Sequence, residues 1–392
     1  MEKNKTLTFN PYTSVVVSSL QKEDKFLESI LSSDIEISLR KIDRPIILYG
    51  AGNFGKMAKD FLNYLDIPFL CVVDKNASQY KTDEHWQNIE IIRPDDIKGT
   101  DKKDCLLIIC IVTTPLIALR DELMADGWKD IAFFYDISEA YRDRHPLSNG
   151  WFLGKLNEKE KESIKKVFSL LADDISRAYY MQFLAWRKLR IELLFDGLET
   201  NNDNRFFIPE ITRTLRENEV FVDCGAHKGS ITEKFLKTVN NKYKKIYAVE
   251  PDASNLEVLK ARLKDVPNIT IIKHALSDKN SEERFYQGFN FASKLSKNGS
   301  SLIKTITLDS LKIPATFIKM HLEGGELDAL KGAVNTISKY CPIIAVTIYH
   351  NSDGAWKTPL FLMDNTKNYK YYIRSDSWGG TGVVFYAAPE EK

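Results

Sequence analysis

The strongest constraint on this chain is a glycine turn between a strand and a helix, in the run VFVDCGAHKGS at 220–230. Residues 220–222 are apolar and predict a buried strand. Gly225 and Gly229 let the backbone after it pass close to a ligand, because they lack a Cβ. ITEKFLKTV then predicts a helix, and KIYAVEP predicts a second strand that ends at Glu250, 21 residues after Gly229. Strand, glycine turn, helix, strand and terminal acid are typical of a nucleotide-binding half-fold, in which the acid can bond both hydroxyls of a ribose.

A second glycine turn lies far upstream, in RPIILYGAGNFGKMAKDFL. Its glycines have GxGxxG spacing after a strand at 46–49, and the next strand, FLCVVD, ends in an acid 19 residues after the last glycine. This pattern predicts a second nucleotide site, for NAD, a nucleotide-sugar or coenzyme A. The alternative is an α/β scaffold that presents a surface to a partner or substrate. The candidate residues are Gly50, Gly52, Asn53, Phe54, Gly55 and Asp74.

Composition excludes several classes of function. The chain has 392 residues, with 55 basic and 54 acidic side chains and a net charge of +1, so nothing favours a nucleic acid or an anionic membrane as partner. The longest apolar run, 105–112, is too short to cross a bilayer. The first residues lack an apolar signal core. The five cysteines form no CxxC pair, so no structural zinc site is expected. We therefore expect a cytoplasmic protein with no transmembrane segment.

The alternation of patterns predicts an α/β protein with two doubly wound domains. Residues 155–200 lack this alternation. They have helical periodicity and an aromatic cluster, which predicts helices buried against a domain or, alternatively, a lid over a cleft. We expect four segments: a leader at 1–44, a Rossmann-like domain at 45–145, a helical linker or cap at 146–215 and a second α/β domain at 216–392. The leader should contain one amphipathic helix near 23–39. The Rossmann-like domain should end with the strand DIAFFYD.

Residues 219–388 resemble the FkbM-type methyltransferases. VFVDCGAHKGS, YAVEPDASN, HALSD, TITLDSL and IKMHLEGGELDALKGA follow one another in the order of that family's motifs. The GxxxG spacing also resembles methyltransferases that use S-adenosylmethionine (SAM) more than dinucleotide dehydrogenases. The resemblance implies a seven-stranded sheet, mostly parallel, with a reversed strand at the edge. It also implies SAM as cofactor and transfer of a methyl group to an oxygen, often on a sugar, a glycan or a glycan precursor.

The resemblance and the strand ends together predict the SAM pocket, because the carboxyl ends of parallel strands meet in one crevice. Asp223 is expected to bond the amino group of the cofactor or to order water beside it. Glu250 is expected to hold the ribose. The full set of predicted cofactor residues is Asp223, Gly225, Ala226, Gly229, Glu250, Pro251, Asp252, Ala275, Leu276 and Ser277.

The chain departs from the family pattern at His321, where the family usually has an aspartate. An imidazole there can serve as a base or as a metal ligand. Alternatively, His321 is a drifted residue in a weakened enzyme, or a structural histidine. The resemblance places this position beside the transferred methyl group. The candidate bases are His321, Glu323, Glu326 and His350, and a divalent metal held by His321 and Glu323 is possible.

Three classes of function remain open from the sequence. The first is a SAM-dependent O-methyltransferase acting on a small-molecule or glycan acceptor. The second is an NAD-linked oxidoreductase or a nucleotide-sugar-binding protein that uses the first glycine turn. The third is a binding protein in which a degenerate methyltransferase fold is kept as a scaffold.

Overall fold

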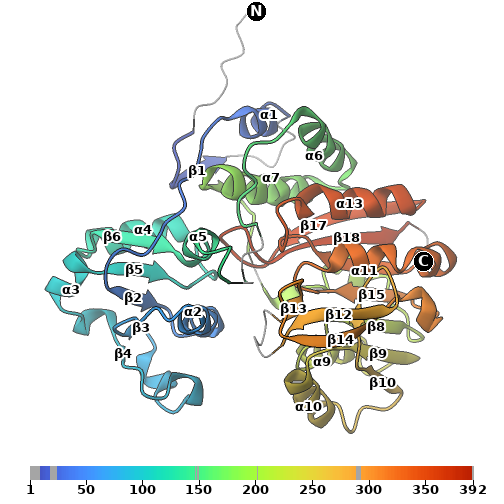
Figure 1. Cartoon of the computed structure of the whole chain (residues 1–392). Coiled ribbons are helices and arrows are strands. Elements are labelled where there is room, and N and C mark those ends of the chain that lie inside the picture. Colours follow the sequence, from blue (N-terminus) through green and yellow to red (C-terminus); the bar gives the residue numbers. More distant parts are fainter. Residues whose placement is uncertain are drawn as a thin grey trace, which may run out of the picture.

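The computed structural model of the chain describes residues 9–17, 24–145, 147, 150–200, 202–287 and 293–390. Two large sheets lie side by side, and α1, α6 and α7 lie together beside them (Figure 1). The mixed α/β fold confirms the predicted class. Within the described residues no helix is both long and apolar enough to cross a membrane.

The larger sheet has seven strands in the order β10-β9-β8-β15-β16-β18-β17. All pairings are parallel except those of β18, which runs antiparallel to both of its neighbours. The reversed strand therefore lies one place in from the edge, between β16 and β17, and β17 forms the edge. The strands are β8 (Val220–Cys224), β9 (Lys245–Val249), β10 (Ile269–Ile272), β15 (Phe317–Met320), β16 (Ile343–Thr347), β17 (Tyr369–Ser375) and β18 (Val383–Pro389).

Both faces of this sheet are covered, because its strands are apolar on both sides. In β8, Val220 and Val222 point into the core that contains α7 and α11–α13, while Phe221 points into the core that contains α8 and α9. A smaller cluster beneath α10 includes Leu256 and Leu259. The helices are α8 (Pro209–Thr212), α9 (Ser230–Thr238), α10 (Ala253–Arg262), α11 (Glu326–Lys331), α12 (Val334–Tyr340) and α13 (Gly354–Asn365).

A small four-stranded sheet follows β10, and sequence analysis did not predict it. The apolar run ITIIKHAL divides into β10 and a two-residue strand that joins the small sheet. Figure 1 shows β12, β13 and β14 beside the carboxyl end of the seven-stranded sheet. The strands are β11 (Ala275–Leu276), β12 (Ser281–Tyr286), β13 (Lys294–Leu295) and β14 (Ser301–Ile306).

The first large sheet is wholly parallel, with the order β4-β3-β2-β5-β6. Helices α2 and α5 pack on one face and α4 on the other. The expected strand DIAFFYD ends at Phe133, and the chain continues directly into α5. The elements are β2 (Ile46–Tyr49), α2 (Asn53–Tyr64), β3 (Val72–Val73), β4 (Ile91–Ile92), α3 (Gly99–Asp104), β5 (Leu106–Ile109), α4 (Leu116–Ala125), β6 (Asp130–Phe133) and α5 (Phe134–Ala140). Short 3₁₀ helices lie at 77–80, 84–86, 94–96, 202–204 and 309–311.

The segment 155–200 is not helical throughout. Its two helices, α6 (Glu158–Leu170) and α7 (Asp174–Leu189), are followed by β7 (Ile191–Phe195), which pairs in parallel with β1 (Thr13–Val17). The predicted leader helix is shorter than expected, since α1 spans Asp24–Ser32. The aromatic side chains of α7 are all buried and the helix packs against β17, so it forms part of the core and is not a lid.

Buried arginines on α7 join the two large sheets. Arg190, in a left-handed C-cap conformation, forms an ion pair of 2.7 Å with Asp136 of α5. Arg187 donates to the carbonyl oxygen of Tyr349, 2.6 Å away, just beyond β16. The indole of Trp151 stacks on Tyr135, with ring centroids 3.7 Å apart. The loop after β16 is thereby fixed against the first sheet.

Candidate active site

The glycine turn after β8 brings two strand ends into close contact. Gly225 has φ +75°, and a Cβ on this residue would lie 2.0 Å from the carbonyl oxygen of His321, which follows β15. The amides of Gly225 and Ala226 both donate to the carbonyl oxygen of Val249, 2.9 Å away, at the end of β9. A residue with a side chain would separate these strand ends, so glycine is required at 225.

Beneath the turn lies a buried ion pair. Lys319 Nζ lies 2.9 Å from Asp223 Oδ1 and also donates to the carbonyl oxygen of Gly225 at 2.8 Å. The second oxygen of Asp223 accepts from Thr232 Oγ1 at 2.7 Å. Asp223 is fully buried and Lys319 almost so. The carboxylate of Asp223 therefore fixes the turn from below, and its predicted bond to the amino group of the cofactor or to a water beside it stays a prediction.

Glu250, at the end of β9, faces the cavity above the turn. Its Oε2 accepts from the amide of His227 at 2.8 Å, and its Oε1 accepts from the amide of Asp252 at 3.0 Å and from Asn255 Nδ2 at 3.3 Å. Burial raises the pKa of this carboxyl, and the two backbone bonds oppose the shift. A carboxylate offers about four lone-pair sites, so Glu250 can still accept a hydrogen bond from a hydroxyl group.

The cavity at the carboxyl ends of β8, β9 and β15 holds about 1020 Å³, open mouth included. Six predicted cofactor residues line it: Gly225, Ala226, Glu250, Pro251, Ala275 and Leu276. Four others, Asp223, Gly229, Asp252 and Ser277, do not. Gly229 and Asp252 have structural roles, since a Cβ on Gly229 would meet Leu259 at 2.9 Å and Asp252 caps α10. The structure thus brings six of the ten predicted residues to one cavity, and whether this cavity binds the cofactor stays a prediction.

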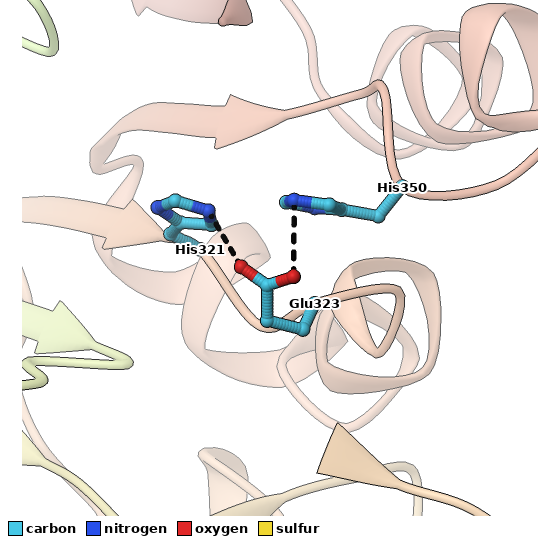
Figure 2. Close-up of side chains that lie close together, drawn as sticks. All are labelled: His321, Glu323 and His350. Atoms are coloured by element: carbon cyan, nitrogen blue, oxygen red, sulfur yellow. Dashed lines mark ion pairs between the residues drawn. The ribbon is translucent and has the colours of Figure 1, made fainter. Parts of the chain in front are cut away.

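Two of the four candidate bases face this cavity. His321 and Glu323 line it, whereas Glu326 and His350 lie behind them and are 3% exposed. Glu323 Oε1 lies 3.1 Å from His321 Nε2, and its Oε2 lies 3.4 Å from His350 Nε2. Figure 2 shows the carboxylate of Glu323 placed between the two imidazoles.

Glu326, at the start of α11, positions its neighbours. Its Oε1 accepts from the amide of Leu322, from Thr347 Oγ1 and from His350 Nδ1, at 3.0, 2.8 and 2.9 Å. Its Oε2 accepts from the amide of Gly324 at 2.9 Å. These bonds, with His350, hold the pKa of Glu326 below its usual value despite burial. A carboxylate so occupied is a poor base, and its role is to orient His350 and the loop that carries Glu323.

Burial also sets the charge states of the cavity-lining pair. Desolvation, reinforced by the nearby Arg205 guanidinium, lowers the pKa of His321 well below its ordinary value. Desolvation raises the pKa of Glu323, although the neighbouring His350 opposes the shift. His321 is therefore a neutral imidazole at neutral pH, and Glu323 is a stronger proton acceptor than an exposed glutamate.

Several functional candidates were missed by sequence reasoning. Arg205 lines the cavity, and its guanidinium forms an ion pair of 2.7 Å with Asp376 and donates to Tyr349 Oη at 3.0 Å. Lys294, on β13, lines the cavity too, and burial lowers its pKa. Lys319, beneath the glycine turn, was missed as well, although a lysine inside the apolar run FIKM is a sequence signal that could have identified it. Arg205 and Lys294 lie outside every recognised motif, so no sequence signal pointed to them.

The first sheet carries a separate cleft at the carboxyl ends of β2, β3 and β5. It holds about 1530 Å³, open mouth included. Of the six predicted residues, Gly50, Gly52, Asn53, Phe54 and Asp74 line it. Gly55 does not, because it packs α2 against the strand: a Cβ there would lie 1.9 Å from the carbonyl oxygen of Gly50. Asp74 Oδ2 accepts from the amide of Ala51 at 2.7 Å.

Comparison with known proteins agrees with this description. Residues 223–373 match the model of the methyltransferase FkbM domain. The methyltransferase FkbM of Methylobacillus flagellatus KT is similar over 88% of this chain and 90% of its own, with a TM-score of 0.58 and 20% sequence identity. That similarity establishes a shared fold.

More distant structural matches cover about half of the chain. The precorrin-6y C5,15-methyltransferase of Geobacter metallireducens GS-15 is 17% identical over 49% of this chain and 89% of its own, with a TM-score of 0.32. A SAM-dependent methyltransferase of Aquifex aeolicus is 15% identical over 48% and 90%, with a TM-score of 0.27. The comparison with curated proteins gives no match. The family assignment of residues 223–373 therefore rests on the match to the methyltransferase FkbM domain model.

Proposed function

We propose that this chain, which contains an FkbM methyltransferase domain, transfers the methyl group of SAM to a hydroxyl oxygen of a sugar, a glycan or a glycan precursor. One observation carries the proposal: a single cavity is lined by Glu250 and the glycine turn and also by His321 and Glu323. The first group suits the ribose and methionine parts of SAM, and the second suits a hydroxyl that must lose a proton.

The protein needs only to align the acceptor oxygen with the methyl group and to remove the hydroxyl proton, because the sulfonium of SAM is already an activated methyl donor. The hydroxyl proton would pass to Glu323 or to the neutral imidazole of His321. The oxygen–methyl bond would form as the sulfur–methyl bond breaks, which leaves S-adenosylhomocysteine. A polyhydroxylated acceptor fits the charged wall formed by Arg205, Lys294 and Glu323, since the two cationic side chains donate hydrogen bonds and the carboxylate accepts them.

We expect Glu250→Gln to weaken SAM binding. The amide keeps the shape of the carboxylate but loses charge-assisted bonds to the ribose, worth roughly 1.5–3 kcal/mol each, so Kd should rise at least about tenfold per bond. Isothermal calorimetry with SAM and with S-adenosylhomocysteine measures this. The matched control is Glu257→Gln on α10, whose carboxylate is exposed. Unchanged affinity in both Glu250→Gln and Glu250→Ala would mean that the cofactor lies elsewhere.

Turnover separates an enzyme from a scaffold. The full chain is incubated with SAM carrying a deuterated methyl group and with a panel of free sugars and nucleotide-sugars, and products are followed by mass spectrometry. Transfer of the labelled methyl group to an acceptor oxygen supports the proposal. SAM binding without turnover on any acceptor would favour the scaffold alternative.

A second candidate function belongs to the first sheet. We propose that its cleft binds a nucleotide, because the glycine turn and Asp74 line a cavity large enough to hold one. Gly52 offers a selective test. A Cβ on this residue would meet only Tyr80 Oη, at 3.8 Å, so a larger side chain there occupies the cleft without a clash in the fold.

We expect Gly52→Val to remove any rise in melting temperature that NAD, coenzyme A or a nucleotide-sugar causes in the wild-type chain. The melting temperature without ligand should change little, and methyl transfer should survive because the two cavities belong to different sheets. Gly99→Val is the control, since a Cβ there has no neighbour within 4 Å. If none of these nucleotides stabilises the wild-type chain, the cleft is a scaffold.

A further inference from the structure

We propose that His321, Glu323 and His350 bind a divalent transition-metal ion in the cavity wall. One nitrogen from each histidine and one oxygen from Glu323 all lie within 4.8 Å of one another. His321 Nε2 lies 3.1 Å from Glu323 Oε1, and His350 Nε2 lies 3.4 Å from the other carboxylate oxygen, Oε2. Metal–ligand bonds of about 2.0–2.2 Å place adjacent ligand atoms roughly 3.0–3.4 Å apart, so these spacings fit an ion that both oxygens of Glu323 hold between the two rings. Sequence analysis named two of these ligands, and the structure adds His350.

The hydrogen bond of His350 to Glu326 fixes which ring nitrogen is free. Glu326 Oε1 also accepts from the Leu322 amide and from Thr347 Oγ1, so it is an acceptor, and His350 Nδ1 carries the proton that bonds to it. In a neutral ring Nε2 then presents a lone pair to Glu323 Oε2, 3.4 Å away. A cation between the two acceptors removes this repulsion. A carboxylate that orients a histidine in this way is a regular partner of metal sites in proteins.

The loop after β15 holds Glu323 in place between the two rings. Glu323 has φ +52°, which is unusual for a residue with a side chain, and Gly324 has φ +104°. The amides on both sides, those of Leu322 and Gly324, donate to Glu326. The carboxylate of Glu326 therefore holds the loop that carries Glu323 and also orients His350.

The ligand set indicates the kind of ion. Two imidazoles and one carboxylate suit Zn²⁺, Fe²⁺, Mn²⁺ or Co²⁺, whereas Mg²⁺ and Ca²⁺ prefer oxygen ligands alone. Because His321 and Glu323 line the cavity, the remaining coordination positions would face it. If the proposed function holds, hydroxyl oxygens of the acceptor would fill those positions. The ion would lower the pKa of the reacting hydroxyl. Because His321 and Glu323 would then be ligands and not bases, the proton would pass to water at the open mouth, in place of the transfer to Glu323 or His321 that applies without an ion.

Metal binding can be measured without turnover. The full chain is stripped with a chelator and titrated with Co²⁺, and the visible absorption is followed. We expect one ion per chain. Glu323→Gln and His321→Asn should lose this ion, and Glu326→Gln should bind it about 10- to 100-fold more weakly because His350 loses its orienting carboxylate. His85→Gln, in the 3₁₀ helix at 84–86 between β3 and β4, is the matched control and should bind as the wild type does. SAM affinity, measured on each variant, reports that the variant is folded.

The proposal is overturned if the wild-type chain binds none of Co²⁺, Mn²⁺ and Zn²⁺, or if Glu323→Gln and His321→Asn bind Co²⁺ as the wild type does. Failure of the metal site and failure of the proposed function are distinguishable. SAM binding and chelator-insensitive turnover without an ion would leave the function standing, whereas Co²⁺ binding without SAM binding would leave only the metal site.

Discussion

Replacing Lys319 with methionine is expected to destabilise the chain by about 3–5 kcal/mol, because the substitution leaves the carboxylate of Asp223 buried without its cation. The two groups are 2.9 Å apart in the sheet interior, and neither is more than 1% exposed. The turn also loses a donor to the carbonyl oxygen of Gly225. Since this turn forms part of the cavity wall, SAM affinity should fall as well. Urea denaturation, followed by circular dichroism, measures the loss in the free energy of unfolding.

Two further variants test the explanation. Lys331→Met removes an ion pair of the same length class, 2.7 Å to Asp328, but both partners are about half exposed, so the cost should stay below about 1 kcal/mol. In the double variant Asp223→Asn/Lys319→Met the unpaired charge is gone, and a large part of the lost stability should return. If the double variant is no more stable than Lys319→Met alone, the uncompensated charge of Asp223 is not the cause.

The parallel sheets could be predicted from sequence because their strands are buried on both faces. Runs such as VFVDC and PIIAVTIYH are apolar throughout and end in polar residues or glycine, which distinguishes them from amphipathic helices. For the same reason, the acid that follows β3 and the acid that follows β9 could each be placed at the carboxyl edge of its own sheet, beside the glycine turn of that sheet. Glu250 and the cavity-lining glycine Gly225 were therefore found without a structure.

The parts that could not be predicted depend on contacts between distant segments. IELLF, 191–195, continues a helical pattern, and it is a strand because it pairs with Thr13–Val17, almost 180 residues away. Likewise, Glu326 lies five residues after His321 in the same motif, which suggests from the sequence that Glu326 is a base. Only the fold shows that its oxygens are occupied by two amides, Thr347 and His350.

His321→Ala is expected to slow methyl transfer by about 10²–10⁴-fold with little change in SAM affinity, because this side chain lies beside Glu323 and not at Glu250, the acid that we propose holds the ribose. The magnitude is that of a positioned base, and loss of a metal ligand should cost at least as much. Single-turnover rates with saturating SAM measure the effect. His85→Ala, which removes an imidazole from the 3₁₀ helix between β3 and β4, is the control and should leave the rate unchanged.

The pH dependence of the rate separates the two roles of His321. Burial holds the pKa of this imidazole well below its ordinary value, so the ring is neutral at and above neutral pH and becomes protonated only in acid. If the ring is the base, the rate is flat above about pH 6.5 and falls as the pH drops through the lowered pKa. If the ring is a metal ligand, the rate instead rises above neutrality as the bound hydroxyl ionises, and a chelator abolishes it. We expect the second profile. Full activity in His321→Ala would contradict both roles and leave Glu323 as the base.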